Sequence, residues 1–122
     1  MKYLALDVGT RRTGVAFGDS ETGIPLPLET IHHTSFSELL ESVRSLVVGR
    51  SVDLVLLGMP LLPSGKPGSQ TKVARDFADM LSRYDIPFEF IDERYTTPGG
   101  KETDPDSSAA CAILGIKLSL DR

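Results

Sequence analysis

The sequence has one cysteine, no excess of basic residues and no apolar run of the length that a membrane-spanning helix requires. Because Cys111 has no partner cysteine within the chain, an internal disulfide is excluded, which agrees with a reducing compartment. A spanning helix needs roughly 18 or more apolar residues in a row. The apolar stretch near the N-terminus is interrupted by Asp7, so it is not typical of a signal peptide. These features predict a cytoplasmic protein that does not contact a membrane.

Metal-binding histidines and cysteines are also scarce. His32 and His33 are adjacent, and no other His or Cys stands at the spacing of a zinc site, so we interpret both as loop residues. Cys111 lies among alanines in a predicted helix, which favours a core thiol over a nucleophile. The formal net charge of −4 argues against a broad basic surface for nucleic acid, although two bound divalent cations would offset it.

With 122 residues, 40% apolar and 25% charged, the chain is expected to form one domain over residues 1–122, without repeats or linkers. Hydrophobic periodicity predicts three strands, a helix, a strand, a helix, a strand and a final helix. The predicted strands are residues 2–8, 13–19, 25–31, 52–58 and 87–91, and the predicted helices are residues 35–48, 69–84 and 107–118. The first two strands are expected to form a hairpin, and Pro25 and Pro27 indicate that the third lies at an edge. This order predicts an α/β fold with a mixed five-stranded sheet flanked by helices.

Local residue patterns predict where the first two helices begin and end. Ser35 and Glu38 have the spacing of a capping box, in which two side chains satisfy the backbone N–H groups of a helix start. Gly49 is expected to stop the first helix. Ser69 is expected to cap the second.

Three carboxylates stand at the predicted ends of strands or helices. Asp7 ends the apolar first strand, where a buried carboxylate is costly without a partner. Glu93 follows the last strand. Asp104 and Pro105 fit an N-cap and a first helical position, which leaves Asp106, in the first turn of the last helix, to point into a site.

Carboxylates that a fold brings together bind hard cations such as Mg²⁺ or Mn²⁺. Two such ions about 4 Å apart can position a water, neutralise a phosphate and assist the leaving oxygen. Asp7, Glu93 and Asp106 therefore predict a metal-dependent nuclease. Each acid also has a structural alternative, since Asp7 is compatible with a plain polar strand end and Glu93 with a salt bridge to Arg94 or Arg12.

Polar and basic residues near these acids are candidates for binding substrate phosphates. The turn at residues 9–12 offers backbone amides and two guanidinium groups, but it also fits a hairpin turn with solvated arginines. Residues 65–70 precede a helix N-terminus, a natural anion site, but they also fit an ordinary surface loop. The predicted substrate-binding residues are Thr10, Arg11, Arg12, Lys66, Ser69 and Arg94.

Four segments, in this order along nearly the whole chain, resemble motifs of the YqgF family, also called RuvX, whose fold is RNase H-like. The segments are LALDVGTRRTGVA at residues 4–16, LLGMPL at residues 56–61 followed by Gly68-Ser69, DERYTT at residues 92–97 and DSSAACAIL at residues 106–114. The chain departs from the family between Thr97 and Asp106, where members usually have a longer stretch that contains a helix.

The resemblance implies a nuclease that acts at the 5′ end of the precursor of 16S ribosomal RNA, or a resolvase of Holliday junctions. It also implies that Asp7, Glu93 and Asp106 are the catalytic acids and the metal ligands. Pre-rRNA or branched DNA is then the expected partner, with ribosomal precursor particles as a further one. The chain is expected to be a monomer or a homodimer, because a resolvase that cuts two strands symmetrically needs two active sites.

Two other functions are compatible with the same residues. Asp7-Val8-Gly9-Thr10 also resembles the phosphate loop of actin-like sugar kinases and chaperones, but those proteins need two such domains to enclose a nucleotide. The shortened segment before Asp106 is compatible with a module that binds nucleic acid without cutting it.

Overall fold

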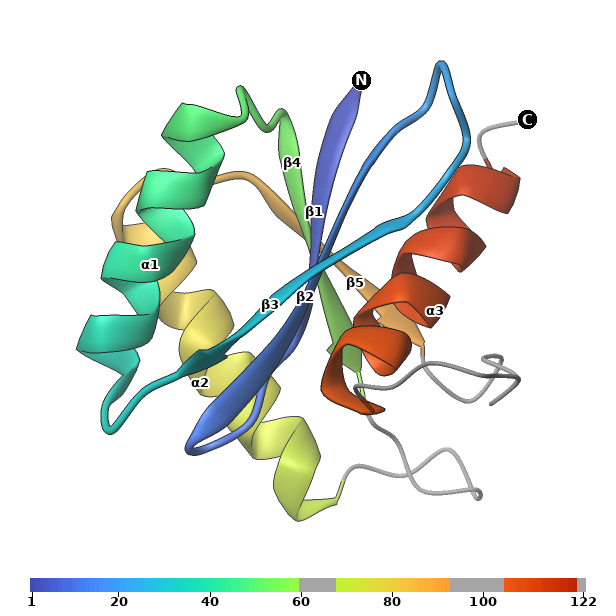
Figure 1. The fold of residues 1–122 in the computed structure, drawn as a ribbon. Helices are drawn as coiled ribbons and strands as arrows, with labels where there is room; N and C mark the ends of the chain where they lie inside the picture. Colours follow the sequence, from blue (N-terminus) through green and yellow to red (C-terminus); the bar gives the residue numbers. More distant parts are fainter. Residues whose placement is uncertain (60–67, 93–104, 121–122) are drawn as a thin grey trace.

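The computed structural model describes residues 1–59, 68–92 and 105–120, and it has the predicted α/β architecture around one mixed five-stranded sheet (Figure 1). The elements are β1 (Lys2–Asp7), β2 (Arg12–Asp19), β3 (Leu26–His32), α1 (Phe36–Gly49), β4 (Leu54–Met59), α2 (Ser69–Arg83), β5 (Phe88–Asp92) and α3 (Pro105–Leu120). The strand order is β3-β2-β1-β4-β5, so the prediction that the third strand lies at an edge is confirmed. β1 pairs with β2 antiparallel and with β4 parallel, and β4 pairs with β5 parallel.

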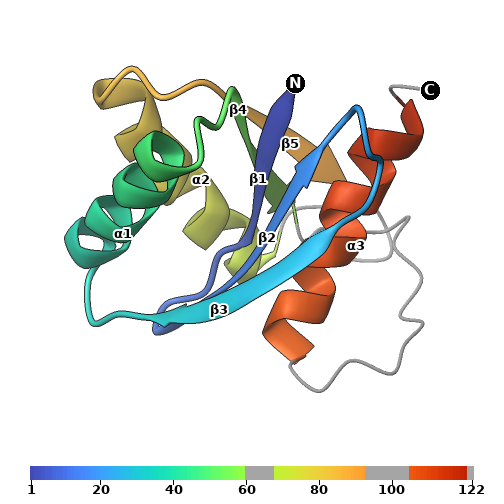
Figure 2. The same cartoon turned by 45° about the horizontal axis from the view of Figure 1, so that its top comes forward.

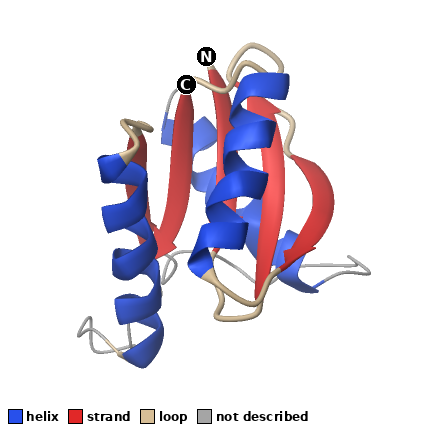
Figure 3. Ribbon diagram, turned by 90° about the vertical axis from the view of Figure 1, so that its left-hand side faces the viewer, coloured by secondary structure: helices blue, strands red, loops and turns tan. Residues whose placement is uncertain are grey.

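The sheet has helices on both faces because its strands alternate apolar side chains to either side. Figures 1 and 3 show α1 and α2 over one face, and Figure 2 shows α3 against the other. The buried cluster between the sheet and α1 and α2 contains Leu4, Leu6, Val8, Val15, Leu39, Leu40, Val43, Val55, Leu57, Phe77, Ala78 and Leu81. The cluster beneath α3 contains Tyr3, Ala5, Ala16, Leu56, Ile91, Ala110, Ile113, Leu114 and Leu118. Neighbouring residues of β1 thus belong to different faces.

The start of α1 satisfies half of the predicted capping box. The Ser35 hydroxyl accepts the Glu38 N–H at 3.3 Å, as expected for an N-cap. The Glu38 carboxylate, however, accepts hydrogen bonds from the backbone N–H and the hydroxyl of Thr34. The Glu38 side chain therefore pairs with Thr34 instead of the N-cap residue Ser35, and this pairing links the loop after β3 to the helix.

α1 ends at Gly49, as predicted, but the left-handed residue that closes it is Ser51, with φ of 55°. The N–H groups of Ser51 and Val52 donate to the carbonyls of Val48 and Val47 at 3.3 and 2.9 Å. This pattern is a Schellman motif, which satisfies carbonyls at a helix end.

Two further predictions about local structure need correction. Ser69 is the first residue of α2 and its N-cap is Gly68, whose N–H donates to the Thr71 hydroxyl at 3.0 Å. His32 ends strand β3 and is not a loop residue, because it pairs with Arg12 across the sheet. The start of α3 at Pro105 agrees with the prediction, whereas Asp104 lies outside the described residues.

Candidate active site at the carboxyl ends of the parallel strands

Asp7 is the last residue of β1, and the alternation of the strand places it on the face covered by α3. Tyr3 and Ala5 belong to the buried cluster beneath α3, and Asp7 is the next residue in that series. Asp7 is half-buried, and its backbone pairs with Gly14 of β2. The carboxylate therefore belongs to the edge of a packed face rather than to the outer surface of a strand.

β5 brings a second series of side chains to the same face. Glu89 forms an ion pair with Lys117 of α3 at 2.9 Å, and Ile91 packs in the cluster beneath α3. Glu93 is the next residue of this series in the sequence, but Glu93 and the predicted substrate-binding residues Arg94 and Lys66 lie outside the described residues.

β4 separates these two strands. Gly58 of β4 pairs with Ile91, and alternation from Leu56 puts it on the α3 face, where it contributes no side chain. Since adjacent strands lie about 4.8 Å apart, β1 and β5 are separated by roughly 10 Å at this end of the sheet.

α3 runs antiparallel to β1, so its first turn lies at the end of the sheet where β1 and β4 finish (Figure 1). Its C-terminal half is anchored near the start of β1, with the Lys117 ammonium 5.9 Å from the centre of the Tyr3 ring. From Tyr3 to Asp7 a strand rises about 13 Å, and from Lys117 back to Asp106 a helix spans about 16 Å. These lengths bring the backbone of Asp106 level with the end of β1.

The fold thus places the backbone of Asp106 and the end of β1 at Asp7 at the same end of the sheet. The described residues alone contain no group of three or more His, Cys, Asp or Glu side chains that is suited to a metal ion, and Glu93 is outside them. A set of three carboxylates has the oxygen chemistry that Mg²⁺ and Mn²⁺ prefer. The donor set therefore fits those metals, and the metal-binding roles stay predictions.

The predicted turn between the first two strands is confirmed, and it lies directly beyond Asp7. A Cβ atom on Gly9 would be 2.3 Å from the Arg12 carbonyl oxygen, a backbone atom, so this position accepts only glycine without a backbone shift. Thr10, Arg11 and Arg12 are exposed to solvent. The turn therefore presents one hydroxyl and two guanidinium groups next to the candidate carboxylate, an arrangement suited to phosphate.

A buried polar pair behind this turn was missed by the sequence analysis. The Thr13 hydroxyl and His33 Nε2 are 2.9 Å apart, and both residues are almost fully buried on the α1 side of the sheet. Burial lowers the pKa of His33, while the Ser35 backbone and the Glu38 carboxylate oppose that shift. The available signal was Thr13 itself, a polar residue at an inward position of an alternating strand.

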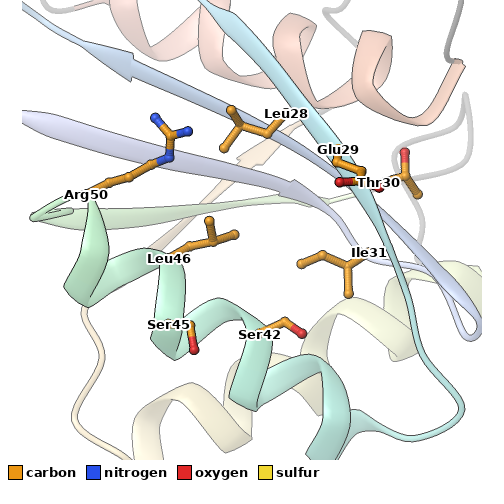
Figure 4. Close-up of a pocket in the computed structure, with 8 residues that line it drawn as sticks. All are labelled: Leu28, Glu29, Thr30, Ile31, Ser42, Ser45, Leu46 and Arg50. Carbon is orange, nitrogen blue, oxygen red and sulfur yellow. The ribbon is translucent and has the colours of Figure 1, made fainter.

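A groove of about 520 Å³ lies elsewhere, between edge strand β3 and α1 (Figure 4). Its lining residues are Leu28, Glu29, Thr30, Ile31, Ser42, Ser45, Leu46 and Arg50. The Arg50 guanidinium also lies 5.1 Å from the centre of the Phe17 ring. No predicted site residue lines this groove.

The fold is of the RNase H-like class, as expected. The chain superimposes on Thermus thermophilus RuvC, solved in complex with a Holliday junction substrate, with a TM-score of 0.70 over 99% of this chain and 95% of that one. The sequence identity is 12%, so this similarity establishes the fold alone. None of the described helices is both long and apolar enough to cross a bilayer.

The chain belongs to the RuvX family, whose model, described as Holliday junction resolvase, matches residues 1–119. A relative from Chloroflexus aurantiacus is 40% identical over 100 residues, which cover 81% of this chain and 65% of the relative. A relative from Paraburkholderia phymatum is 33% identical over 91% of this chain and 80% of its own length. Both are named "Putative pre-16S rRNA nuclease". The match therefore spans just under two thirds of the Chloroflexus protein.

Proposed function

We propose that this protein is a metal-dependent nuclease that hydrolyses phosphodiester bonds of structured nucleic acid, with Asp7, Glu93 and Asp106 as its catalytic acids. The observation that carries the proposal is the alignment of the start of α3 with the end of β1 on one face of the sheet. This alignment supports a shared role for Asp7 and Asp106, which lie far apart in the sequence.

The three carboxylates hold Mg²⁺ or Mn²⁺, and two such ions supply charge neutralisation and an activated water when bound. The side chains of Arg11 and Arg12, and the Thr10 hydroxyl, bind the phosphates that flank the scissile bond. Lys66, Ser69 and Arg94 are assigned to the same task from the sequence. Because Asp7 ends a paired strand, its position is more rigid than that of a loop carboxylate.

The substrate that we propose is the 5′ end of pre-16S ribosomal RNA, within ribosomal precursor particles in the cytoplasm. The shared name of the relatives supports this choice. The second candidate is a four-way DNA junction, which the description of the family model favours. A junction resolvase is expected to act as a homodimer with two sites, whereas RNA trimming needs only a monomer.

A cleavage panel tests both candidates. The full chain is incubated with 5′-extended 16S RNA, a four-way junction and linear duplex DNA, each in Mg²⁺, Mn²⁺ or EDTA. We expect cleavage of the RNA at one end, in metal only, with linear duplex left intact. Symmetric cleavage of the junction alone would move the assignment to a resolvase, and cleavage that persists in EDTA would contradict the metal-dependent mechanism.

A further inference from the structure

His33 contacts the turn beyond Asp7 through both its backbone and its side chain. Its N–H donates to the carbonyl oxygen of Arg11 at 2.9 Å, and its Nε2 lies 2.9 Å from the Thr13 hydroxyl. The two contacts lie on either side of Arg12, whose own backbone pairs with His32. His33 therefore holds the residues that flank one of the candidate phosphate-binding arginines.

The His33 ring is itself held by α1 and α2. It packs against the Phe36 ring at a centroid distance of 6.5 Å, and Phe36 in turn meets Phe77 edge-on at 5.6 Å. His33 is 4% exposed and Thr13 is fully buried, so water does not compete for their hydrogen bond. The hydrogen bond to Thr13 is therefore a buried polar contact that orients the ring.

We propose that the Thr13–His33 pair is a positioning element that fixes the turn at residues 9–12, and with it Arg11 and Arg12, beside the end of β1. The inference rests on the proposed function, since it gives the clamped turn the task of binding substrate phosphate. A buried polar group is costly unless it is paired, so each partner holds the other in one arrangement. Neither residue touches the substrate; both act through the backbone of the turn.

The test compares three variants of the full chain. Thr13→Val removes the hydroxyl with little change of shape, and His33→Leu removes both ring nitrogens. His33→Gln retains a hydrogen-bonding group near the position of Nε2. Ala78→Gly serves as the control for lost stability, because Ala78 is buried on the same face in α2 and makes no hydrogen bond to the turn.

Two quantities are measured: hydrogen exchange of the backbone amides at residues 9–13, and the kinetics of nucleic-acid cleavage. Thr13→Val and His33→Leu should speed exchange in the turn at least about tenfold relative to Ala78→Gly, because the turn opens locally. They should raise KM about three- to tenfold with kcat within a factor of two, as expected when binding is lost equally in the ground and transition states. His33→Gln should restore both quantities toward wild type.

The outcomes separate this inference from the proposed function. Exchange in the turn that is no faster than in Ala78→Gly would overturn the positioning role, and so would a fall in kcat at constant KM. If the wild-type chain neither binds nor cleaves nucleic acid, the proposed function fails, while the exchange rates still decide whether the pair clamps the turn.

Discussion

The two faces of the sheet are packed in different ways. The central strands β1 and β2 present Leu4, Leu6 and Val15 to α1 and α2. Toward α3 the sheet presents Tyr3, Leu56 and Ile91, but also the small residues Ala5 and Ala16, and a Cβ on Gly18 would lie 2.9 Å from Leu114. These small residues let α3 lie close to β1 and β2, and Asp7 lies at the end of this face. We therefore expect packing beneath α1 and α2 to serve mainly stability, and packing beneath α3 to affect the proposed site as well.

The largest expected effect comes from Asp7→Asn. This change keeps the shape of the side chain but removes the negative charge that a divalent cation requires, so metal-dependent cleavage should fall on the order of 100-fold or more. The matched control is Asp92→Asn at the end of β5, because alternation from Phe88 places Asp92 on the opposite face. Activity is measured as kcat/KM in Mg²⁺, and folding by urea unfolding. An equal loss of kcat/KM in both variants would contradict the prediction that the active site lies on the α3 face of the sheet.

The next prediction compares two neighbouring residues of β2 that are both fully buried but face opposite sides. Val15→Ala leaves a cavity toward α1 and α2, and Ala16→Val forces extra volume under α3; each should cost about 1–3 kcal/mol of stability. Only Ala16→Val should lower kcat, about tenfold, because displacement of α3 moves Asp106 away from Asp7. Similar kcat values in the two variants, at matched stability, would contradict the special role of the α3 face.

The sequence was sufficient to predict the elements and their order, because long apolar patterns and turn residues are local signals. It also singled out Asp7 and Asp106 as candidate site residues, since a carboxylate that ends an apolar strand or begins a helix stands out without any structure; their role in a site stays a prediction. The error at Ser69, where Gly68 is the N-cap, is one residue long, as is common for helix ends.

Other features depend on contacts between distant segments and have no local signal. The packing of α3 against β1 includes the contacts of Lys117 with Glu89 and Tyr3, which join residues far apart in the chain. Likewise, the burial of His33 depends on Thr13 and Phe36, so its place in the sequence suggested only a loop. The role of Glu93 in the candidate site is still a prediction from the sequence alone, because that residue lies outside the described part of the chain.

A smaller effect is expected for the ion pair that anchors α3. Lys117→Met keeps the length of the stem but removes the charge, and since Lys117 is 18% exposed and Glu89 44% exposed, the loss should be only about 0.5–1 kcal/mol. The loss should shrink in 1 M salt, which screens exposed charges. Lys72→Met, which breaks the exposed pair with Asp76 on α2, is the control on the opposite face and should change stability less. Urea unfolding at low and high salt measures both.

The smallest effect is a pH dependence of stability that belongs to the α1 and α2 face. Burial, the largest influence, lowers the pKa of His33 from its usual 6.5, and the neighbouring His32 acts in the same direction against the Glu38 carboxylate. Above pH 6.5 the ring is neutral in both states. As the pH falls below 6.5, the unfolded chain binds a proton that the folded chain resists, so stability is lost until the pH reaches the folded pKa. Wild type should therefore lose more stability than His33→Gln between pH 7.5 and 5.5.

Between pH 7.5 and 5.5, the change in stability reports the titration of His33 rather than that of the carboxylates. The pKa values of Glu38 and Asp19 are lowered from 4.5 and 3.8, by hydrogen bonds from Thr34 and from the Glu21 backbone, so their contributions are lost only at more acidic pH. Urea midpoints at several pH values give the slope, and His32→Gln, which retains His33, should keep most of the wild-type slope, because burial is the largest influence on the His33 pKa. If His33→Gln keeps that slope as well, the buried histidine is not the group that senses pH. A slope that disappears in His33→Gln would identify the buried His33 ring as the group whose titration causes this loss of stability.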